Sequence, residues 1–241
     1  AGGTEEAWAS GANGLSARDI AMNVALPEVD GRILARAVSF KAEARYDPAT
    51  EAPVVKYQPV PDRIDFTVAL ARNWARLART PAGDRRVAVI LANYPNRDGR
   101  IGNGVGLDTP ASTRKLRLAM AADGDETGAL PDDGAALIAA LAKGPTNDRR
   151  ARRSGGERLS LADYQAFFAA LPDETRARVD EHWGPPEDDP FFTDGAFTLS
   201  IVRFGNVVLG LQPARGYHID PVRTYHDPDL VPPHGYPAFY S

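Results

Sequence analysis

Two continuous apolar runs of strand length constrain the fold of this 241-residue chain most. They are Arg86-Val-Ala-Val-Ile-Leu-Ala-Asn93 and Gly205-Asn-Val-Val-Leu-Gly-Leu211. Runs without polar alternation are typical of strands that are covered on both faces, as in parallel sheets. We therefore predict that the two runs lie in one sheet as parallel neighbours.

Helical patterns accompany these strands, and an extended segment at 196–204 is predicted to pair near Val207 through a tight turn at Gly205-Asn206. Ahead of the first strand, 14–24 is predicted to be helical behind Ser16, 38–46 extended and 47–61 a loop. The remaining predicted helices are 62–79, 107–122, with Thr109-Pro110 at its start, 133–143, 161–171 and 173–183. This succession predicts an α/β fold with a Rossmann- or flavodoxin-like layered sheet, largely parallel, that carries a helical insertion at about 123–195.

The chain begins without Met in a Gly-Gly loop and ends on the apolar Ala-Phe-Tyr-Ser, so we expect an internal piece of a longer protein. Residues 1–61 are predicted to finish a preceding domain and connect to the core. Residues 62–241 are predicted to form the α/β core domain with its helical insertion.

Composition narrows the class of function. A net charge of −4 and a pI near 5.6 argue against a nucleic-acid binder, because such proteins neutralise phosphates with basic residues. The chain contains no cysteine, which excludes disulfides and thiolate catalysis and leaves nitrogen and oxygen as metal ligands. No apolar run has the length of a membrane span, and the N-terminus lacks a signal-peptide pattern. We expect a cytoplasmic protein.

Polar loops follow both apolar strands. The first loop runs from Asn93 to Asp108, and the second begins at Gln212 and contains Arg215. Parallel neighbours end at the same edge of a sheet, and open α/β sheets bind ligands there. The sequence therefore predicts one shared pocket that is lined by both loops.

The glycines at 99, 102, 104 and 106 precede a predicted helix and can cradle an anion on backbone N–H groups. Their spacing matches neither a dinucleotide-binding fingerprint nor a Walker A loop. A carboxylate-bearing ligand suits Arg97 and Arg100 equally well. The plain alternative, a winding connection without a ligand, stays open.

The tail from Gln212 to Tyr240 holds three of the four histidines, His218, His226 and His234. They stand eight residues apart, so only a folded loop brings them together. Neutral imidazole binds first-row divalent metals such as cobalt, nickel and zinc. Packing residues that form hydrogen bonds are the alternative, and one or two functional histidines are the interpretation we favour.

Three segments resemble one family. They are Gly14-Leu-Ser-Ala-Arg-Asp-Ile-Ala-Met-Asn-Val-Ala-Leu-Pro-Glu-Val-Asp-Gly-Arg-Ile33, the stretch Leu91 to Ser112 with its Asn-Tyr-Pro-Asn-Arg-Asp-Gly-Arg, and the start of the tail. Together they resemble the large, tetrapyrrole-binding subunit of aerobic cobaltochelatase, the CobN family, which is related to the H subunit of magnesium chelatase. The resemblance covers essentially the whole chain except for 123–195.

The resemblance implies an enzyme that inserts cobalt(II), its substrate metal, into hydrogenobyrinic acid a,c-diamide during cobalamin biosynthesis. ATP is then hydrolysed by AAA+ and companion subunits and not by this chain, and the isolated fragment is expected to be inactive. Partners are the corrinoid precursor and those subunits, with no nucleic acid and no membrane.

The resemblance also implies site residues. His234 and His226 are predicted catalytic residues, and with Asp227 they are the predicted metal ligands. His218 stands where the family commonly has Gln, which argues against it, and Glu28 and Asp30 match a motif to which we assign a structural role. The predicted substrate-binding residues are Asn93, Arg97, Asp98, Arg100, Asn103, Gln212, Arg215 and Tyr217.

Two other functions remain open at this point. The chain can be a noncatalytic scaffold or docking domain of the large subunit, in which the motif loops brace neighbouring domains. It can also be an anion- or nucleotide-binding domain that uses the glycine-rich loop.

Overall fold

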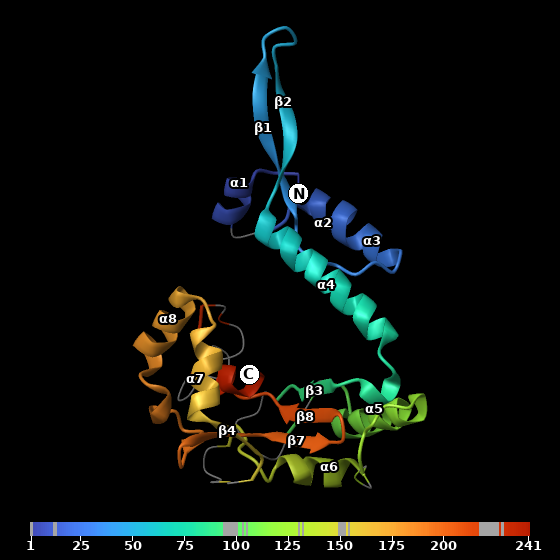
Figure 1. Ribbon diagram of the computed structural model, residues 1–241, viewed down its shortest axis with the longest axis vertical. Helices are drawn as coiled ribbons and strands as arrows, with labels where there is room; N and C mark the ends of the chain where they lie inside the picture. The colour runs from blue at the N-terminus through green and yellow to red at the C-terminus, as the bar shows by residue number, and fades with distance from the viewer. Residues whose placement is uncertain are drawn as a thin grey trace. The chain divides into compact units, whose positions relative to one another are not determined.

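The computed structural model describes residues 2–11, 14–93, 101, 102, 104, 106–129, 131, 133–148, 153, 155–216, 227 and 229–241 (Figure 1). It divides into two compact units, Ala1–Thr80 and Pro81–Ser241. The division follows helix α4 (Pro61–Arg79), whereas the sequence analysis placed a boundary before this helix. The start of α4 belongs to the first unit because Arg63 donates to the Ala37 carbonyl and stacks on Trp8, 4.1 Å from the ring centroid.

The first unit begins with the short helix α1 (Glu5–Ser10) and a longer helical stretch. Ser16 caps that stretch as predicted, through its hydroxyl and the Asp19 amide. It comprises α2 (Ala17–Ile20), a π-helical turn η1 (Ala21–Ala25) and α3 (Leu26–Val29). Pro27 lacks an amide donor and its ring crowds the carbonyl four residues earlier, which accounts for the widened turn just before it.

A β-hairpin of β1 (Ser39–Asp47) and β2 (Ala52–Pro59) completes the first unit before α4. The extended segment at 38–46 is confirmed, but the loop predicted for 47–61 is wrong because most of it is β2. Pro53 and Pro59 suggested a loop. In a two-stranded ribbon both strands are edges, where a proline without a donor is tolerated.

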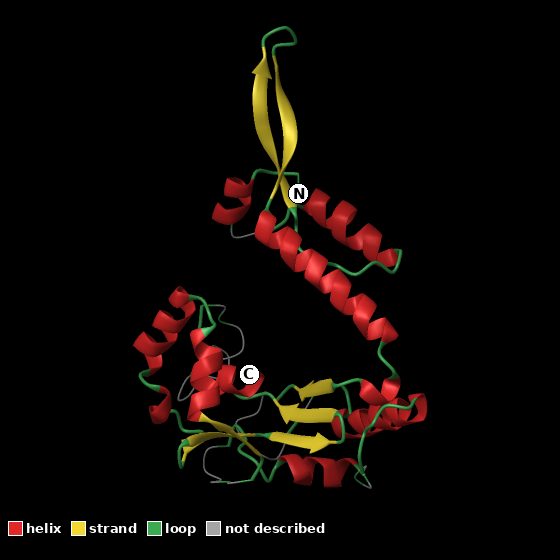
Figure 2. Ribbon diagram, in the orientation of Figure 1, coloured by secondary structure: helices red, strands yellow, loops and turns green. Residues whose placement is uncertain are grey.

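The second unit contains two small sheets with helices packed around them (Figure 2). One sheet has the order β3-β8-β7, from β3 (Val87–Leu91), β8 (Val207–Leu211) and β7 (Ile201–Phe204). The strands β3 and β8 are parallel, with Val87 opposite Val207, as predicted. The β7–β8 hairpin turns at Gly205-Asn206, also as predicted, and Gly205 has a φ of 59°.

The second sheet has the order β4-β6-β5, from β4 (Glu157–Ser160), β6 (Ala196–Leu199) and β5 (Phe192–Thr193), all antiparallel. The α/β class is confirmed, but a largely parallel sheet is not, because β3–β8 is the one parallel pair among the described ladders. The Rossmann- or flavodoxin-like layering stays a prediction. The region 123–195 is also not purely helical, since β4 and β5 both pair with β6.

The predicted helices of the second unit are present. They are α5 (Thr109–Asp123), α6 (Gly134–Leu141), α7 (Leu161–Ala169) and α8 (Asp173–Trp183), followed by a terminal α10 (Gly235–Tyr240). Side chains of Asp133 and Ser160 cap α6 and α7 by accepting backbone N–H bonds. None of the helices within the described residues is both long and apolar enough to cross a bilayer.

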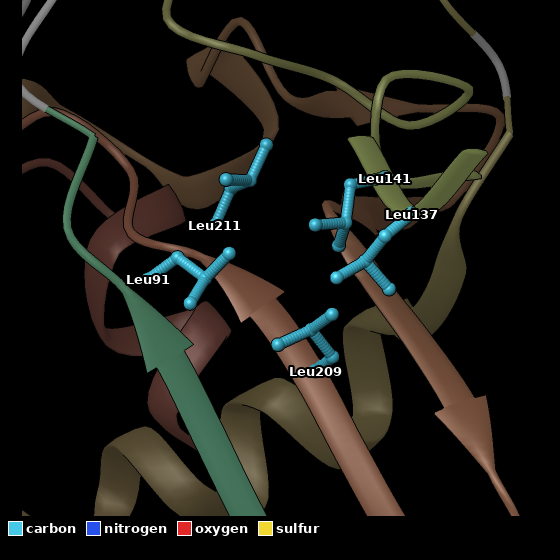
Figure 3. Close-up of a cluster of buried hydrophobic side chains, with 5 residues drawn as sticks. All are labelled: Leu91, Leu137, Leu141, Leu209 and Leu211. Atoms are coloured by element: carbon cyan, nitrogen blue, oxygen red, sulfur yellow. The ribbon is translucent and has the colours of Figure 1, made fainter. Parts of the chain in front are cut away.

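Two apolar clusters hold the second unit together. In the first, α6 covers the β3–β8–β7 sheet, and the buried side chains are those of Leu91, Leu137, Leu141, Leu209 and Leu211 (Figure 3). The second cluster lies where α7 and α10 meet the β4–β6–β5 sheet, and contains Tyr164, Phe197, Leu199, Ala238 and Phe239. Gly210 allows the ring of Phe239 to approach β8, because a Cβ at this position would lie 2.6 Å from the ring. Packing in these two clusters holds strands β3 and β8 in place, and with them the edge of the sheet at which both strands end.

Candidate functional site

The carboxyl ends of β3 and β8 lie side by side. The Gln212 amide donates to the Leu91 carbonyl at 2.9 Å, so the two chains leave the sheet together. Asn93 and Gln212 therefore meet at one edge, as the parallel pairing predicts. This edge is the candidate functional site.

A network of amides joins the segments at this edge. Asn147, in the turn after α6, donates from Nδ2 to the Asn93 carbonyl at 2.6 Å. Its Oδ1 accepts the Ala214 amide at 2.9 Å. The Asn93 Oδ1 in turn accepts the Gly102 amide at 3.3 Å. The predicted ligand-binding side chain of Asn93 is thus buried and engaged within the protein.

Further hydrogen bonds connect the beginning of the tail to its end. Gln212 donates from Nε2 to the Tyr236 hydroxyl at 3.1 Å, and Arg215 donates from Nη2 to the Asp227 carbonyl at 3.3 Å. The Asp227 carboxylate accepts the Asp229 amide at 3.0 Å. A guanidinium has five N–H donors, a number suited to binding a carboxylate as well as a carbonyl.

His234 lies inside the second unit, and 1% of its surface is exposed. Its Nδ1 is 2.6 Å from the Tyr164 hydroxyl, and its Nε2 is 2.9 Å from the Gly184 carbonyl. Both ring nitrogens are therefore engaged, and metal binding requires at least one of these bonds to break. The Asp180 carboxylate lies 3.6 Å from Nε2. The catalytic and metal roles of His234 stay predictions, and they require such a rearrangement.

Burial raises the pKa of the Tyr164 phenol, and the nearby charges of Asp189 and Asp180 raise it further. The phenol is neutral at physiological pH and provides a donor for the Nδ1 of His234. Nε2–H then donates to the Gly184 carbonyl, because a carbonyl can only accept. In the tautomer that carries its proton on Nε2, the ring accepts at Nδ1 and donates at Nε2.

Several predicted site residues lie outside the described residues. They are Arg97, Asp98, Arg100, Asn103, Tyr217 and His226, and their assignments stay predictions. Within the described part of the chain, no group of three histidine, aspartate or glutamate side chains is placed to hold a metal ion.

A small cavity lies at this edge, beside Asn93, Asn147 and Gln212. Its free volume is about 20 Å³, which is room for a single water molecule and far below that of a tetrapyrrole. Polar side chains of Thr146, Thr198 and Ser200 also line it.

A larger cavity of about 490 Å³ lies in the first unit. Much of its wall comes from the motif 14–33, including Leu15, Asp19, Asn23 and Pro27. The Asp19 carboxylate accepts the Gly2 amide, the Ser16 hydroxyl and the Asn23 amide, and these bonds lower its pKa. The carboxylate of Asp19 is thereby engaged in hydrogen bonds within the unit.

The helix that follows the glycine-rich loop, α5, has a carboxylate side chain at its N-terminus. The Asp108 carboxylate caps α5 by accepting the Ala111 amide at 3.0 Å, in place of the Thr109-Pro110 cap that the sequence suggested. A carboxylate in this position competes with a phosphate for the helix N-terminus.

Three residues that form these hydrogen bonds were not predicted from the sequence, namely Asn147, Tyr164 and Tyr236. Asn147 lies in the region without a recognisable motif, 54 residues from the Asn93 carbonyl that it contacts. Tyr164 is one of many apolar residues on its helix, and only its partner 70 residues away distinguishes it. Tyr236 stood in the tail, but no local pattern paired it with Gln212.

The model of the family described as CobN/Magnesium Chelatase matches residues 1–241 of the chain. The chain belongs to this family. It is 56% identical to the aerobic cobaltochelatase subunit CobN of Sinorhizobium sp over 240 residues, which are 100% of this chain and 19% of that protein. It is 50% identical to the aerobic cobaltochelatase subunit CobN of Pseudomonas aeruginosa over 97% of this chain and 19% of that protein.

A solved structure agrees with these family relatives. The catalytic subunit of cobaltochelatase from Mycobacterium tuberculosis superimposes with a TM-score of 0.76 and 38% sequence identity, over 99% of this chain and 20% of that one. The chain thus spans about a fifth of the length of the relatives it matches. The family resemblance seen in the sequence is confirmed.

Proposed function

We propose that this CobN-family chain is part of the tetrapyrrole-binding large subunit of an ATP-dependent cobaltochelatase, which inserts cobalt(II) into hydrogenobyrinic acid a,c-diamide. The observation that carries the proposal is the 56% identity over the whole chain to a protein named as a cobaltochelatase subunit. ATP hydrolysis falls to AAA+ and companion subunits, since no Walker A pattern occurs in the sequence. Residues outside this chain complete the enzyme.

Metal insertion replaces ring N–H protons by the cation, which must lose its hydration shell. A base beside the ring nitrogens accepts the protons, and imidazole has a suitable pKa. His226 is the first choice for this base, because His234 has to give up a hydrogen bond before it can act. Asp227 stands next to His226 and is the proposed third ligand for the incoming cobalt.

The corrinoid precursor carries peripheral carboxylates, and guanidinium groups bind carboxylates in a bidentate manner. Arg215, Arg97 and Arg100 are the proposed partners. Arg215 is supported by its position at the edge where β3 and β8 end, beside the Asp227 carbonyl to which it donates. Asn93 and Gln212 are proposed to contribute by shaping this edge, since their side chains are engaged within the unit. Asp98, Asn103 and Tyr217 remain proposed contacts.

Titration of the complete large subunit with the corrinoid, followed by absorbance, tests this proposal. Arg215→Ala should weaken binding on the order of tenfold, the usual effect of losing one charge-assisted pair. Arg178→Ala is the matched control, because Arg178 also donates to a tail carbonyl, that of Asp229, but from helix α8. Equal binding by wild type and Arg215→Ala would remove Arg215 from the site. His226→Ala should abolish cobalt insertion while corrinoid binding persists.

A scaffold or docking role within the same subunit is the second candidate. It is favoured by the engagement of His234, Asn93 and Gln212 in internal hydrogen bonds and by the small size of the cavity beside Asn93 and Gln212. Calorimetric titration of this chain with the corrinoid and separately with Co²⁺ distinguishes the two. Heat of binding from a folded sample favours a site, and its absence favours the scaffold. The anion- or nucleotide-binding alternative is weaker, because Asp108 occupies the helix N-terminus it would use.

A further inference from the structure

The side chain of Asn147 forms hydrogen bonds to both segments that leave the parallel strands. It is 9% exposed and lies in the turn that follows α6, where the Thr146 hydroxyl accepts the Asp148 amide. Neither the family motifs nor the sequence analysis assigns it a role. Its two hydrogen bonds run in opposite directions, as donor to the Asn93 carbonyl and as acceptor from the Ala214 amide.

The bonds of Asn147 reach further through Asn93. The Asn93 side chain accepts a hydrogen bond from the Gly102 backbone amide. Residues 93 and 102, which lie at either end of residues 94–101, are therefore joined to each other. The Ala214 end of the network lies one residue before Arg215. Asn147 thus joins the loop after β3 to the residue before Arg215, in addition to the backbone bond from Gln212 to the Leu91 carbonyl.

The side-chain amide of Asn147 serves both partners at once. A primary amide offers a donor and an acceptor on one planar group, whereas a carboxylate offers acceptors and a hydroxyl is shorter. Both partners are backbone groups of buried residues, Asn93 at 5% and Ala214 at 6% exposure. Without Asn147 these backbone groups lose their partner in a region with room for about one water molecule.

We infer that Asn147 is a positioning residue, which sets the distance between the loop after β3 and the tail after β8 and thereby aligns the groups that bind the tetrapyrrole. This inference rests on the proposed function. It extends the site to a segment between α6 and β4 that carries none of the family motifs. Asn147 touches neither the ring nor the metal in this assignment.

The matched control is Asn206. It lies at the opposite, amino-terminal end of β8 and donates from Nδ2 to the Gly83 carbonyl at 2.8 Å. It thus also joins two segments through a side-chain amide, namely the β7–β8 turn and the residues ahead of β3. Asn206→Ala therefore removes a hydrogen bond of the same kind at the edge of the sheet opposite the candidate site.

The first measurement is hydrogen exchange in the complete large subunit without ligand. Asn147→Ala should accelerate exchange of the Ala214 and Gly102 amides, whereas Asn206→Ala should leave both unchanged. Asn147→Asp keeps an acceptor for the Ala214 amide but loses the donor to Asn93. It should therefore preserve protection at Ala214 and lose it at Gly102. Unchanged exchange at both amides in Asn147→Ala would overturn the inference, whatever the protein binds.

The second measurement is cobalt insertion by the assembled enzyme with ATP. Asn147→Ala should raise KM for the corrinoid on the order of tenfold with a smaller change in kcat, and Asn206→Ala should leave KM within about twofold. A purely structural Asn147 predicts equal effects of the two variants, and that result would overturn the inference while the function stands. If the wild-type enzyme neither binds corrinoid nor inserts cobalt, the proposed function fails and the positioning role fails with it.

Discussion

At the residue scale, the imidazole ring of His234 is held by two hydrogen bonds, one at each ring nitrogen. The Tyr164 hydroxyl donates to Nδ1, and Nε2 donates to the Gly184 carbonyl. His234→Ala removes both and leaves a void, so we expect the free energy of unfolding to fall by about 2–4 kcal/mol. Urea denaturation measures this loss. His182→Ala is the control, since His182 is exposed at the end of α8, and its change should stay within about 0.5 kcal/mol.

The loss in His234→Ala has a functional counterpart. If cobalt insertion by the complete enzyme falls only in proportion to the folded fraction, His234 is a packing residue and the base is elsewhere. A loss of insertion with folded protein and unchanged corrinoid binding would instead support the catalytic role. Tyr164→Phe removes the hydrogen bond at the Nδ1 of His234 but keeps an aromatic ring at position 164. It therefore tests the role of this bond in cobalt insertion without creating a large void.

Tyr164 also makes stability depend on pH. Burial raises the pKa of its phenol above the unfolded value of about 10, so the folded state holds the proton more tightly. Its contribution is therefore fully present below about pH 10 and is lost as pH rises above it. Burial, together with a hydrogen bond to Tyr236, also raises the pKa of Tyr240, to about 12. Urea midpoints from pH 8 to 11 should decline above pH 10, and less so in Tyr164→Phe.

At the element scale, strand β8 is the element on which both apolar clusters depend. Its Leu209 and Leu211 belong to the first cluster, and Gly210 between them leaves space for Phe239 of the second. Gly210→Val places a Cβ where the Phe239 ring lies, so we expect a loss of roughly 2–4 kcal/mol in the free energy of unfolding. Thermal denaturation followed by circular dichroism measures it.

Gly83→Ala is the control for this substitution. Gly83 has no positive φ, and a Cβ there would meet its nearest atom at 3.7 Å, an ordinary contact. Its midpoint should match that of the wild type. A Gly210→Val protein as stable as Gly83→Ala would show that Phe239 does not pack on β8.

The sequence predicted the elements whose patterns are long or unambiguous. The helix predicted at 173–183 is α8, and the apolar runs are β3 and β8 in parallel. The strands β4 and β5 were missed because four and two residues carry too little periodicity, and β2 was missed because its prolines resemble a loop. The edge of the site followed from the parallel pair. The partners of Asn93 and His234 did not, because they lie 54 and 70 residues away and no local pattern encodes them.

At the scale of the whole molecule, the two units differ in how much core each contains. In Pro81–Ser241 the two clusters bury leucine, phenylalanine and tyrosine side chains from strands and helices of that unit alone. Among the described residues of Ala1–Thr80, the buried apolar side chains are those of Phe40 and Val60, whereas Val29, Leu34 and Val68 are more than half exposed. A chain of this length is marginally stable even with a full core.

We therefore expect segment 81–241 to fold alone and segment 1–80 not to. Hydrophobic burial is the main favourable term in folding, and the first unit lacks enough of it to offset the entropy of ordering its backbone. Expressed separately, 81–241 should give dispersed amide resonances and a cooperative thermal transition. Segment 1–80 should show collapsed dispersion or association that grows with concentration. Cooperative unfolding of monomeric 1–80 would contradict this, and would indicate that the hairpin and α4 stabilise the unit without a large core.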